Sequence, residues 1–444
     1  MAPCGIEDLP DELMVTIFSH LKNEELALNA RNVCTRWKNI ADSDVLWKNY
    51  NLESYPLATE KVIELIQNMP SLKKYSNDME IEEREEVFLA LATNCKLLKD
   101  FSVPNITVPL TSLKVLLDNL SNLESLSFSI SGENALSTEI IGHMDTIKKL
   151  TLFKNEDDFF FNFDILRPIR VGCPNLRSLR LAGFSNGVAE EDIVLLITAK
   201  SNNLKIFAWE GTMNFKMLLA LCQCSHLSEL QLLNFHLTDH DNTEVQFSES
   251  LESVVYQNSE IQCLPVVLNK SCLQLKNLII AQIKGNTTIS LKYIFSNCVN
   301  LETLHLSELE VTDEALTNIS CEFLEELIIN DCTGWSYFSI CHLSITCTNL
   351  IKLFFGNQTV SEDVCSEIMK FDNLKYLQFA WCNLENFSFQ KIKTSLPRLN
   401  YICMHDCSMD LSGHRDLLIL GQCRRDVNII FETETDDDTD EDEF

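Results

Sequence analysis

The chain has 444 residues, which is too long for one ordinary compact domain and predicts either several domains or a repeat array. Its hydrophobic residues make up 45% of the total, so it can bury a sizeable core and is not a disordered chain. The formal net charge of −30 repels phosphate backbones and disfavours nucleic acid as a partner.

The chain begins with an acidic segment, residues 1–11, that lacks the basic and apolar parts of an export signal. Residues 332–351 carry no charged side chain and have the length of a membrane span, but their many Ser, Thr, Asn and His residues make them too polar to cross a bilayer. We therefore expect a cytoplasmic and/or nuclear protein without a membrane partner. There, its 18 cysteines should be reduced thiols.

The pattern of residues 1–50 predicts a small three-helix domain. Leu9-Pro10 opens a helix on which Leu13, Ile17 and Leu21 form an apolar stripe. Further apolar positions follow at Val33, Trp37 and Trp47. The pattern alone leaves two interpretations open, a docking module or a cap for the open end of a repeat array.

The order of these residues resembles an F-box. The matching positions are Ile6-Glu7-Asp8-Leu9-Pro10-Asp11-Glu12-Leu13, Ile17-Phe18, Leu21, Leu26, Val33-Cys34, Trp37 and Leu46-Trp47. The resemblance implies that this domain binds a Skp-family adaptor, which sits on a cullin scaffold with a RING subunit. The residues expected to contact the adaptor are Leu9, Pro10, Leu13, Ile17, Leu21, Val33, Trp37 and Trp47.

Residues 51–431 repeat one apolar pattern, in which the second apolar position follows the first by three residues and the third follows the second by two. Clear units run from Leu98-Phe101-Val103 to Leu399-Ile402-Met404, with a mean period of about 25 residues, inside the range of leucine-rich repeats. The last two apolar positions share one face of a short strand, and the rest of each unit has helical periodicity. We predict an α/β leucine-rich-repeat solenoid of about fourteen repeats and a terminal strand. In this horseshoe, parallel strands line the concave face and helices lie outside.

The cysteines follow the same register. Eight of them stand three residues before a leading apolar position, among them Cys95 and Cys298, and others stand where the chain leaves a strand. Apolar residues fill these slots in other repeats, so we interpret the cysteines as packing residues. Cys403, His405 and Cys407 are therefore not expected to bind a metal, since zinc usually needs four convergent ligands. No cofactor is expected.

An F-box followed by leucine-rich repeats resembles the F-box/LRR family. The resemblance implies a substrate receptor of an SCF (Skp-cullin-F-box) ubiquitin ligase complex, whose repeats bind a target protein for protein ubiquitination and proteasomal degradation. No nucleophile elbow, phosphate-binding loop or His-Glu metal motif is present, so the chain is not expected to be an enzyme. The alternative is a scaffold or inhibitor that uses protein–protein interaction without ubiquitin transfer. The sequence does not identify the target.

The strand residues that alternate with the buried pairs predict where the target binds. In the C-terminal repeats these positions are apolar or aromatic: Ile328, Phe354, Tyr376, Tyr401, and Trp381 at a strand end. Adjacent exposed aromatic residues usually mark a partner site. The alternative is that C-terminal residues fold back and cover this patch.

Two further segments depart from the repeat. Four phenylalanines within residues 159–163 predict an insert that folds back onto the repeats or offers a contact site. Residues 432–444 carry nine acidic residues without Lys or Arg, and we predict a disordered acidic tail. The tail either keeps the protein soluble and shields the last strand or attracts basic targets.

Overall fold

The computed structural model describes residues 5–43, 45–47, 49–52, 58–69, 71–77, 85–130, 143–154, 166–184, 190–237, 247–260, 272–284, 288–384, 387, 389–423 and 426–432. The chain divides into two compact units, Met1–Gly211 and Thr212–Phe444. The predicted insert at residues 159–163 and the predicted tail, apart from Glu432, lie outside the described residues.

The first unit begins with a small helical domain. Its elements are η1 (Ile6–Asp8), α1 (Asp11–Phe18), α2 (Asn23–Leu28), η2 (Ala30–Asn32) and α3 (Thr35–Ala41). Pro10 caps the start of α1, where its missing N–H costs no hydrogen bond. The side chain of Glu25 closes the first turn of α2 by accepting the backbone N–H of Lys22 at 3.0 Å. Met14 and Phe18 face the interior and form the buried stripe of α1.

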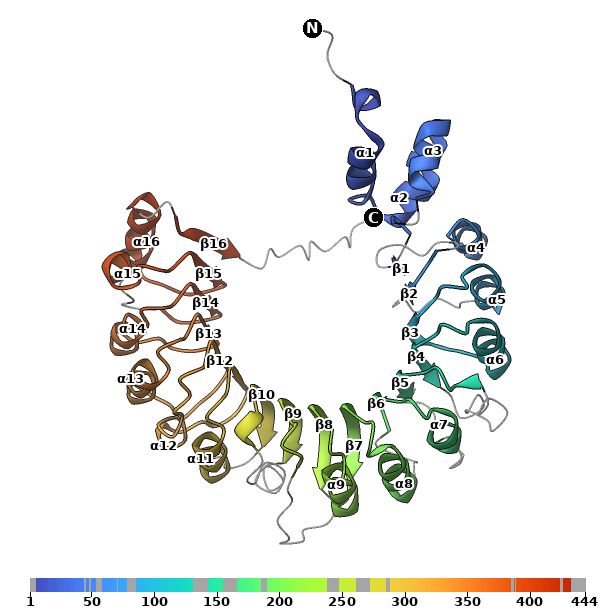
Figure 1. Cartoon of the computed structure of the whole chain (residues 1–444). Coiled ribbons are helices and arrows are strands. Elements are labelled where there is room, and N and C mark those ends of the chain that lie inside the picture. Colours follow the sequence, from blue (N-terminus) through green and yellow to red (C-terminus); the bar gives the residue numbers. More distant parts are fainter. Residues whose placement is uncertain are drawn as a thin grey trace, which may run out of the picture. The chain divides into compact units, whose positions relative to one another are not determined.

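The rest of the first unit is a series of strand–helix repeats (Figure 1). The strands are β1 (Asn49–Leu52), β2 (Lys74–Asn77), β3 (Asp100–Thr107), β4 (Ser125–Ile130), β5 (Lys149–Lys154), β6 (Ser178–Ala182) and β7 (Ile206–Met213), which ends just inside the second unit. The helices are α4 (Thr59–Gln67), α5 (Glu85–Asn94), α6 (Leu110–Asn119), α7 (Leu166–Gly172) and α8 (Glu190–Lys200). Successive strands pair in parallel.

The second unit continues the same pattern. Its strands are β8 (Glu229–Leu237), β9 (Ser253–Glu260), β10 (Asn277–Lys284), β11 (Thr303–Ser307), β12 (Glu326–Asn330), β13 (Lys352–Gly356), β14 (Tyr376–Ala380), β15 (Tyr401–His405) and β16 (Asn428–Glu432). Its helices are α9 (Phe215–Cys222), η6 (Cys272–Gln274), α11 (Thr288–Asn297), α12 (Asp313–Leu316), α13 (Tyr337–Thr346), α14 (Glu362–Ile368), α15 (Phe389–Ser395) and α16 (Leu411–Cys423). These strands also pair in parallel, each with its neighbours in sequence.

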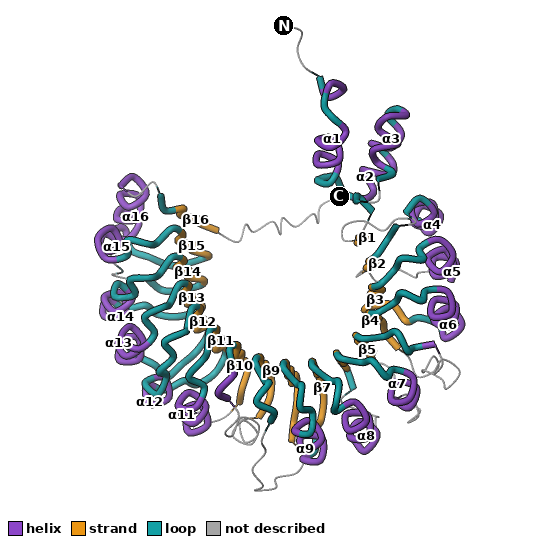
Figure 2. The backbone as a smooth tube through the Cα atoms, in the orientation of Figure 1, coloured by secondary structure: helices purple, strands orange, loops and turns teal. Residues whose placement is uncertain are grey.

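In each unit the helices line one side of the strands, and the other side carries no helix (Figure 2). The buried core lies between the two layers and follows the predicted register. In β13, for example, Leu353 and Phe355 are buried, whereas Phe354 between them points to the helix-free face and is partly exposed. The predicted α/β leucine-rich-repeat solenoid, with a small helical domain before it, is confirmed.

The backbone bends sharply at one position of the repeats in the second unit. The residue two positions beyond the third apolar residue of the repeat has a positive φ, inside the strand in β8 to β10 and just after it in β11 to β15: Asn234, Asn258, Gln282, Glu308, Asp331, Asn357, Trp381 and Asp406. This left-handed conformation is uncommon outside glycine, and Asn and Asp tolerate it best. Trp381, with φ of 50°, is the one bulky side chain in this series of described residues.

The cysteine positions agree with the predicted packing role in most repeats. Cys95, Cys173, Cys224, Cys298, Cys321 and Cys347 are fully buried in the slot three residues before the leading apolar residue. Burial raises the pKa of the Cys321 thiol to about 12, so it stays protonated at neutral pH. Cys423 departs from the expectation because it is exposed at the end of α16.

Candidate functional site

The small N-terminal domain presents an apolar surface. Helix α1 buries Met14 and Phe18 on one face, so its other face turns Leu13 and Ile17 outward. Leu13 is 52% exposed, and Val33, just before α3, is 57% exposed. Clustered exposed apolar side chains of this kind mark a protein-binding surface more often than a free one.

An arginine holds the segment before α1 in place. The guanidinium of Arg36 on α3 donates hydrogen bonds to the backbone carbonyls of Glu7 and Leu9. The same group pairs with the carboxylate of Asp11 at 2.7 Å. Leu9 is therefore tied to α3 while Pro10 next to it stays exposed. Arg36 stands directly before the motif residue Trp37, but no apolar pattern marks it, so its anchoring role is seen only in the structure.

One predicted adaptor-binding residue is corrected. Trp47 is only 2% exposed, and its indole N–H donates to the backbone carbonyl of Ala41, so it is a core residue of the domain. Trp37 is half-buried, with its ring edge-on to Phe18 at 5.1 Å between centroids. Leu21 is partly exposed, beyond the end of α1. The motif alone could not separate Trp47 from the surface residues, because F-box positions serve both the fold and the interface.

The second candidate surface lies on the helix-free face of the second unit. Ile328 in β12 and Phe354 in β13 are neighbours across the strand pair. Tyr376 in β14 and Tyr401 in β15 are also direct neighbours, with ring centroids 5.9 Å apart. These four predicted residues are all at least partly exposed, and they form two pairs on successive strands. Gln378 stands beside Phe354 in the next strand.

Trp381 extends this face at the end of β14. Its side chain is 51% exposed, and its ring stands edge-on against His405 at 4.9 Å between centroids. Its backbone N–H donates to the carbonyl of His405 at 2.8 Å, which stabilises the positive φ. A bulky residue in this conformation stores strain, and stored strain is concentrated at functional positions. The contact with His405 was not anticipated, since it joins two strands.

An ion pair lies beside the aromatic residues on this face, because Lys352 is the neighbour of Tyr376 in the next strand and pairs with Glu326 at 2.9 Å. His305 in β11 lies beside Ile328, and burial lowers the pKa of its imidazole against the raising effect of Glu326. His305 is therefore neutral at physiological pH. Within the described residues, no three His, Cys, Asp or Glu side chains converge as metal ligands, and no helix has the length and apolarity to cross a membrane.

The comparison with known families settles the nature of the N-terminal domain. Its residues 6–53 match the F-box-like family model. Residues 6–53 are an F-box-like domain. The chain is 23% identical over 237 residues to the putative F-box/LRR-repeat protein 22 of Arabidopsis thaliana, covering 52% of this chain and 69% of that protein. The human F-box only protein 44 is 38% identical over 48 residues, which are 11% of this chain and 19% of that protein.

Solved structures with a similar course of the chain include the Rad7–Elc1 complex of yeast, with a TM-score of 0.48 and 12% identity over 95% of this chain and 92% of that one. The Leptospira interrogans LRR protein LIC12759 has a TM-score of 0.46 and 15% identity over 92% and 98% of the two chains. In the present chain the F-box-like domain is followed by the strand–helix repeats described above.

Within the F-box-like domain, the structure separates interface candidates from core residues. The predicted residues that are exposed or partly exposed remain our candidates for adaptor binding: Leu9, Pro10, Leu13, Ile17, Leu21, Val33 and Trp37. The F-box-like domain ends close to the first strand, because β1 begins at Asn49 and pairs with β2. The predicted boundary after residue 50 therefore falls inside β1.

Proposed function

We propose that this chain is the substrate-recognition subunit of an SCF-type ubiquitin ligase. The observation that carries the proposal is the exposed apolar surface of the F-box-like domain, formed by Leu9, Pro10, Leu13, Ile17 and Val33. Such a surface in an F-box-like domain fits a Skp-family adaptor. The leucine-rich repeats that follow supply a long surface for a second protein.

In this proposal the chain binds and positions, and other subunits carry out the chemistry. The adaptor would join the F-box-like domain to a cullin and its RING subunit, on which a conjugating enzyme acts. The helix-free face around Phe354 and Tyr376 would hold the target so that its lysines reach that enzyme. We place this activity in the cytoplasm, the nucleus or both, as the sequence predicts.

Affinity purification with quantitative mass spectrometry tests the adaptor contact. Leu9→Ala combined with Pro10→Ala removes one partly exposed and one exposed apolar side chain, and we expect recovery of adaptor and cullin to fall at least about tenfold, the effect of losing interface anchors. Arg36→Ala leaves those side chains in place but frees the segment that carries them, so it should lower recovery as well.

Leu89→Ala is the control, because Leu89 on α5 is an exposed leucine outside the F-box-like domain. It should leave adaptor recovery unchanged. Circular dichroism must show that all variants keep their helices. If the Leu9/Pro10 double variant is folded and recovers adaptor and cullin like the wild type, the proposed docking surface is wrong.

A further inference from the structure

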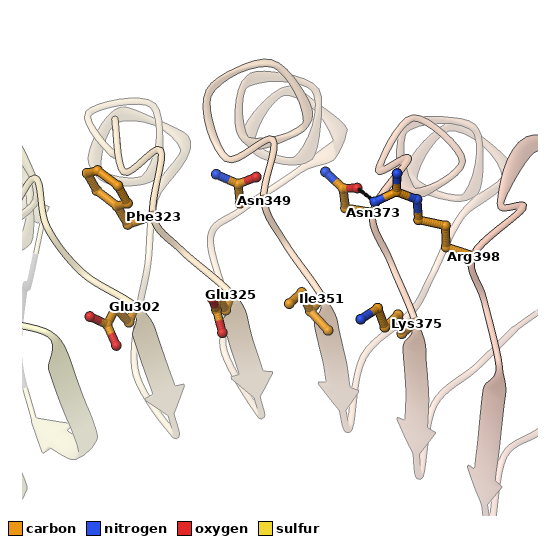
Figure 3. Close-up of a pocket in the computed structure, with 8 residues that line it drawn as sticks. All are labelled: Glu302, Phe323, Glu325, Asn349, Ile351, Asn373, Lys375 and Arg398. Atoms are coloured by element: carbon orange, nitrogen blue, oxygen red, sulfur yellow. Dashed lines mark hydrogen bonds between the residues drawn. The ribbon is translucent and has the colours of Figure 1, made fainter.

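The second unit contains a groove on the edge where its helices lead into its strands. It has a volume of about 280 Å³. Figure 3 shows one row of side chains near the helices and a second row where the strands begin. The lining residues are Glu302, Phe323, Glu325, Asn349, Ile351, Asn373, Lys375 and Arg398. We name this hollow the rim groove; it lies at the edge of the sheet and excludes Phe354, Tyr376 and Tyr401 of the helix-free face.

Some charges along this edge form ion pairs between neighbouring repeats outside the rim groove. In the first unit, Glu124 lies between Lys99 and Lys148, at 3.8 and 3.0 Å. In the second unit, Lys276 pairs with Glu252 at 3.3 Å. Each pair joins the same position of neighbouring repeats, which is the position just after the leading apolar residue. In these repeats, opposite charges at this position neutralise one another.

The charges that line the rim groove are arranged differently. Glu302 and Glu325 follow each other in adjacent repeats, and Ile351 stands between them and Lys375. Among the described residues, neither acid nor Lys375 has an ion-pair partner within 4.0 Å, and the nearby Lys352 is already paired with Glu326 at 2.9 Å. The rim groove is left with a negative end and a positive end.

A second regular feature is interrupted at both ends of the rim groove. An asparagine just before the leading apolar residue often donates its amide N–H to a carbonyl of the preceding repeat, as Asn349 does to Glu322 at 2.9 Å and Asn373 to Thr348 at 2.8 Å. Phe323 replaces this asparagine at the acidic end and is 56% exposed. Arg398 replaces it at the basic end, and its guanidinium donates to the side-chain oxygen of Asn373.

We propose that the rim groove binds an extended segment of a partner protein that carries a Lys or Arg and, about four residues further along, a carboxylate or phosphate. The cation would lie between Glu302 and Glu325 with the ring of Phe323 against it, a favourable cation–π arrangement. The anion would meet Lys375 and Arg398, whose guanidinium suits planar oxyanions.

The spacing follows from the repeat. Neighbouring strands are about 4.8 Å apart, so the acidic and basic ends are separated by roughly 10–15 Å, the length of three to four extended residues. The volume of about 280 Å³ lies below the usual roughly 300–1,000 Å³ of small-molecule pockets. It suits a few side chains of a longer segment. The site needs no adaptor, so it stands independently of the proposed ligase function.

Fluorescence polarisation with the full chain tests this site. The probe is an N-terminally fluorescein-labelled, C-terminally amidated peptide, Gly-Arg-Ser-Leu-Ser-Glu-Gly, and a second probe has phosphoserine in place of Glu. Peptides with only the Arg or only the anion should bind at least about tenfold more weakly, since each loses one charge-assisted contact. Comparison of the two probes shows whether a carboxylate or a phosphate is preferred.

Variants of the chain locate the binding. Glu302→Gln with Glu325→Gln, and separately Lys375→Ala with Arg398→Ala, should each weaken binding at least about tenfold. Glu252→Gln is the matched control because it also removes an exposed edge carboxylate, but one that is already paired with Lys276, and it should leave affinity within about twofold. All of these side chains are on the surface, so the variants should fold. Failure of both probes at millimolar concentration, or equal weakening by Glu252→Gln, would overturn the proposal.

Discussion

Cys382 and Cys407 occupy the same slot in two neighbouring repeats, three residues after Phe379 of β14 and Met404 of β15. The hydrogen bond between their thiols lowers the pKa of Cys407 and, together with burial, raises the pKa of Cys382. Cys407 is only partly buried, whereas Cys382 is fully buried. Reactivity follows the thiolate, so the two cysteines should behave differently.

The prediction is that Cys407 is alkylated by iodoacetamide in the native protein at neutral pH, while Cys95, Cys173 and Cys321, whose pKa values burial raises to about 12, are not. Because the pKa of Cys407 is lowered, its labelling rate should rise at lower pH than that of an ordinary thiol. Cys382→Ala should shift this rise to higher pH. Peptide mass spectrometry across pH 6–9 measures it.

Cys347→Ala is the control, since it removes another buried thiol that does not contact Cys407. After denaturation, all 18 cysteines should titrate as free thiols. A pH profile of Cys407 that does not move in Cys382→Ala would contradict the assigned hydrogen bond.

At the residue scale, the sequence predicted exposure where the register alone decides it. Phe354 and Tyr376 face outward because strand residues alternate, and this needs no knowledge of other repeats. The burial of Trp47 and the contact of Trp381 with His405 depend on how separate segments pack, so the sequence could not provide them.

At the scale of elements, one carboxylate joins two successive helices. Asp313, the first residue of α12, accepts hydrogen bonds from the backbone N–H of Ser336 at 2.8 Å and from its hydroxyl at 2.7 Å. The hydroxyl of Ser339 in α13 also donates to it at 2.5 Å. Burial raises the pKa of Asp313, but the hydrogen bonds from Ser339 and Ser336 outweigh it and hold the pKa below its ordinary value.

Asp313→Asn should lower the free energy of unfolding by about 1–3 kcal/mol near pH 7, since hydrogen bonds to a charged acceptor are lost. A lowered pKa in the folded state stabilises the protein above the unfolded pKa of roughly 3.9, and this is lost as pH falls through the folded value. The difference between wild type and variant should therefore shrink below about pH 4. Urea unfolding from pH 3 to 7 measures both effects.

Asp363→Asn provides the comparison, because Asp363 is an exposed carboxylate in the first turn of the next helix, α14. Asp363→Asn should lower the free energy of unfolding less than Asp313→Asn does, and its effect should change little with pH. If both variants lose the same free energy of unfolding, the hydrogen bonds that link α12 and α13 do not stabilise the protein more than an exposed carboxylate does.

The sequence predicted strands better than helices. Each strand is fixed by its buried pair, and its place recurs in every repeat. The helical segments only need to cover the core, so their length varies from 4 residues in α12 to 13 in α16. The rim groove could not be predicted, because Glu302, Phe323 and Arg398 become neighbours only when the repeats stack.

At the scale of the whole molecule, the proposed adaptor and target surfaces belong to different units of the chain. Replacing Phe354, Tyr376 and Tyr401 with Ala should therefore reduce target capture without changing adaptor recovery. Each lost aromatic anchor should cost about 1–3 kcal/mol of binding free energy. Quantitative mass spectrometry of purified complexes reports adaptor and targets in one measurement.

The matched control replaces Tyr293, Tyr337 and Phe338 with Ala, which removes the same types of exposed aromatic residue from α11 and α13. This variant should keep its targets. If the triple variant at Phe354, Tyr376 and Tyr401 captures and ubiquitinates targets at wild-type levels, the helix-free face is not the target-binding surface. The insert at residues 159–163 would then be the next candidate.

The strict pairing of each strand in the second unit with its sequence neighbours has an evolutionary consequence. Gene duplication of one whole repeat would add one strand and one helix without repacking the others. A repeat inserted between β9 and β10 would leave both proposed binding sites intact. One inserted between β13 and β14 would separate Phe354 from Tyr376 and Ile351 from Lys375, widening both sites by about 4.8 Å. A protein that gains a repeat at this place could change its binding partner through a single genetic event.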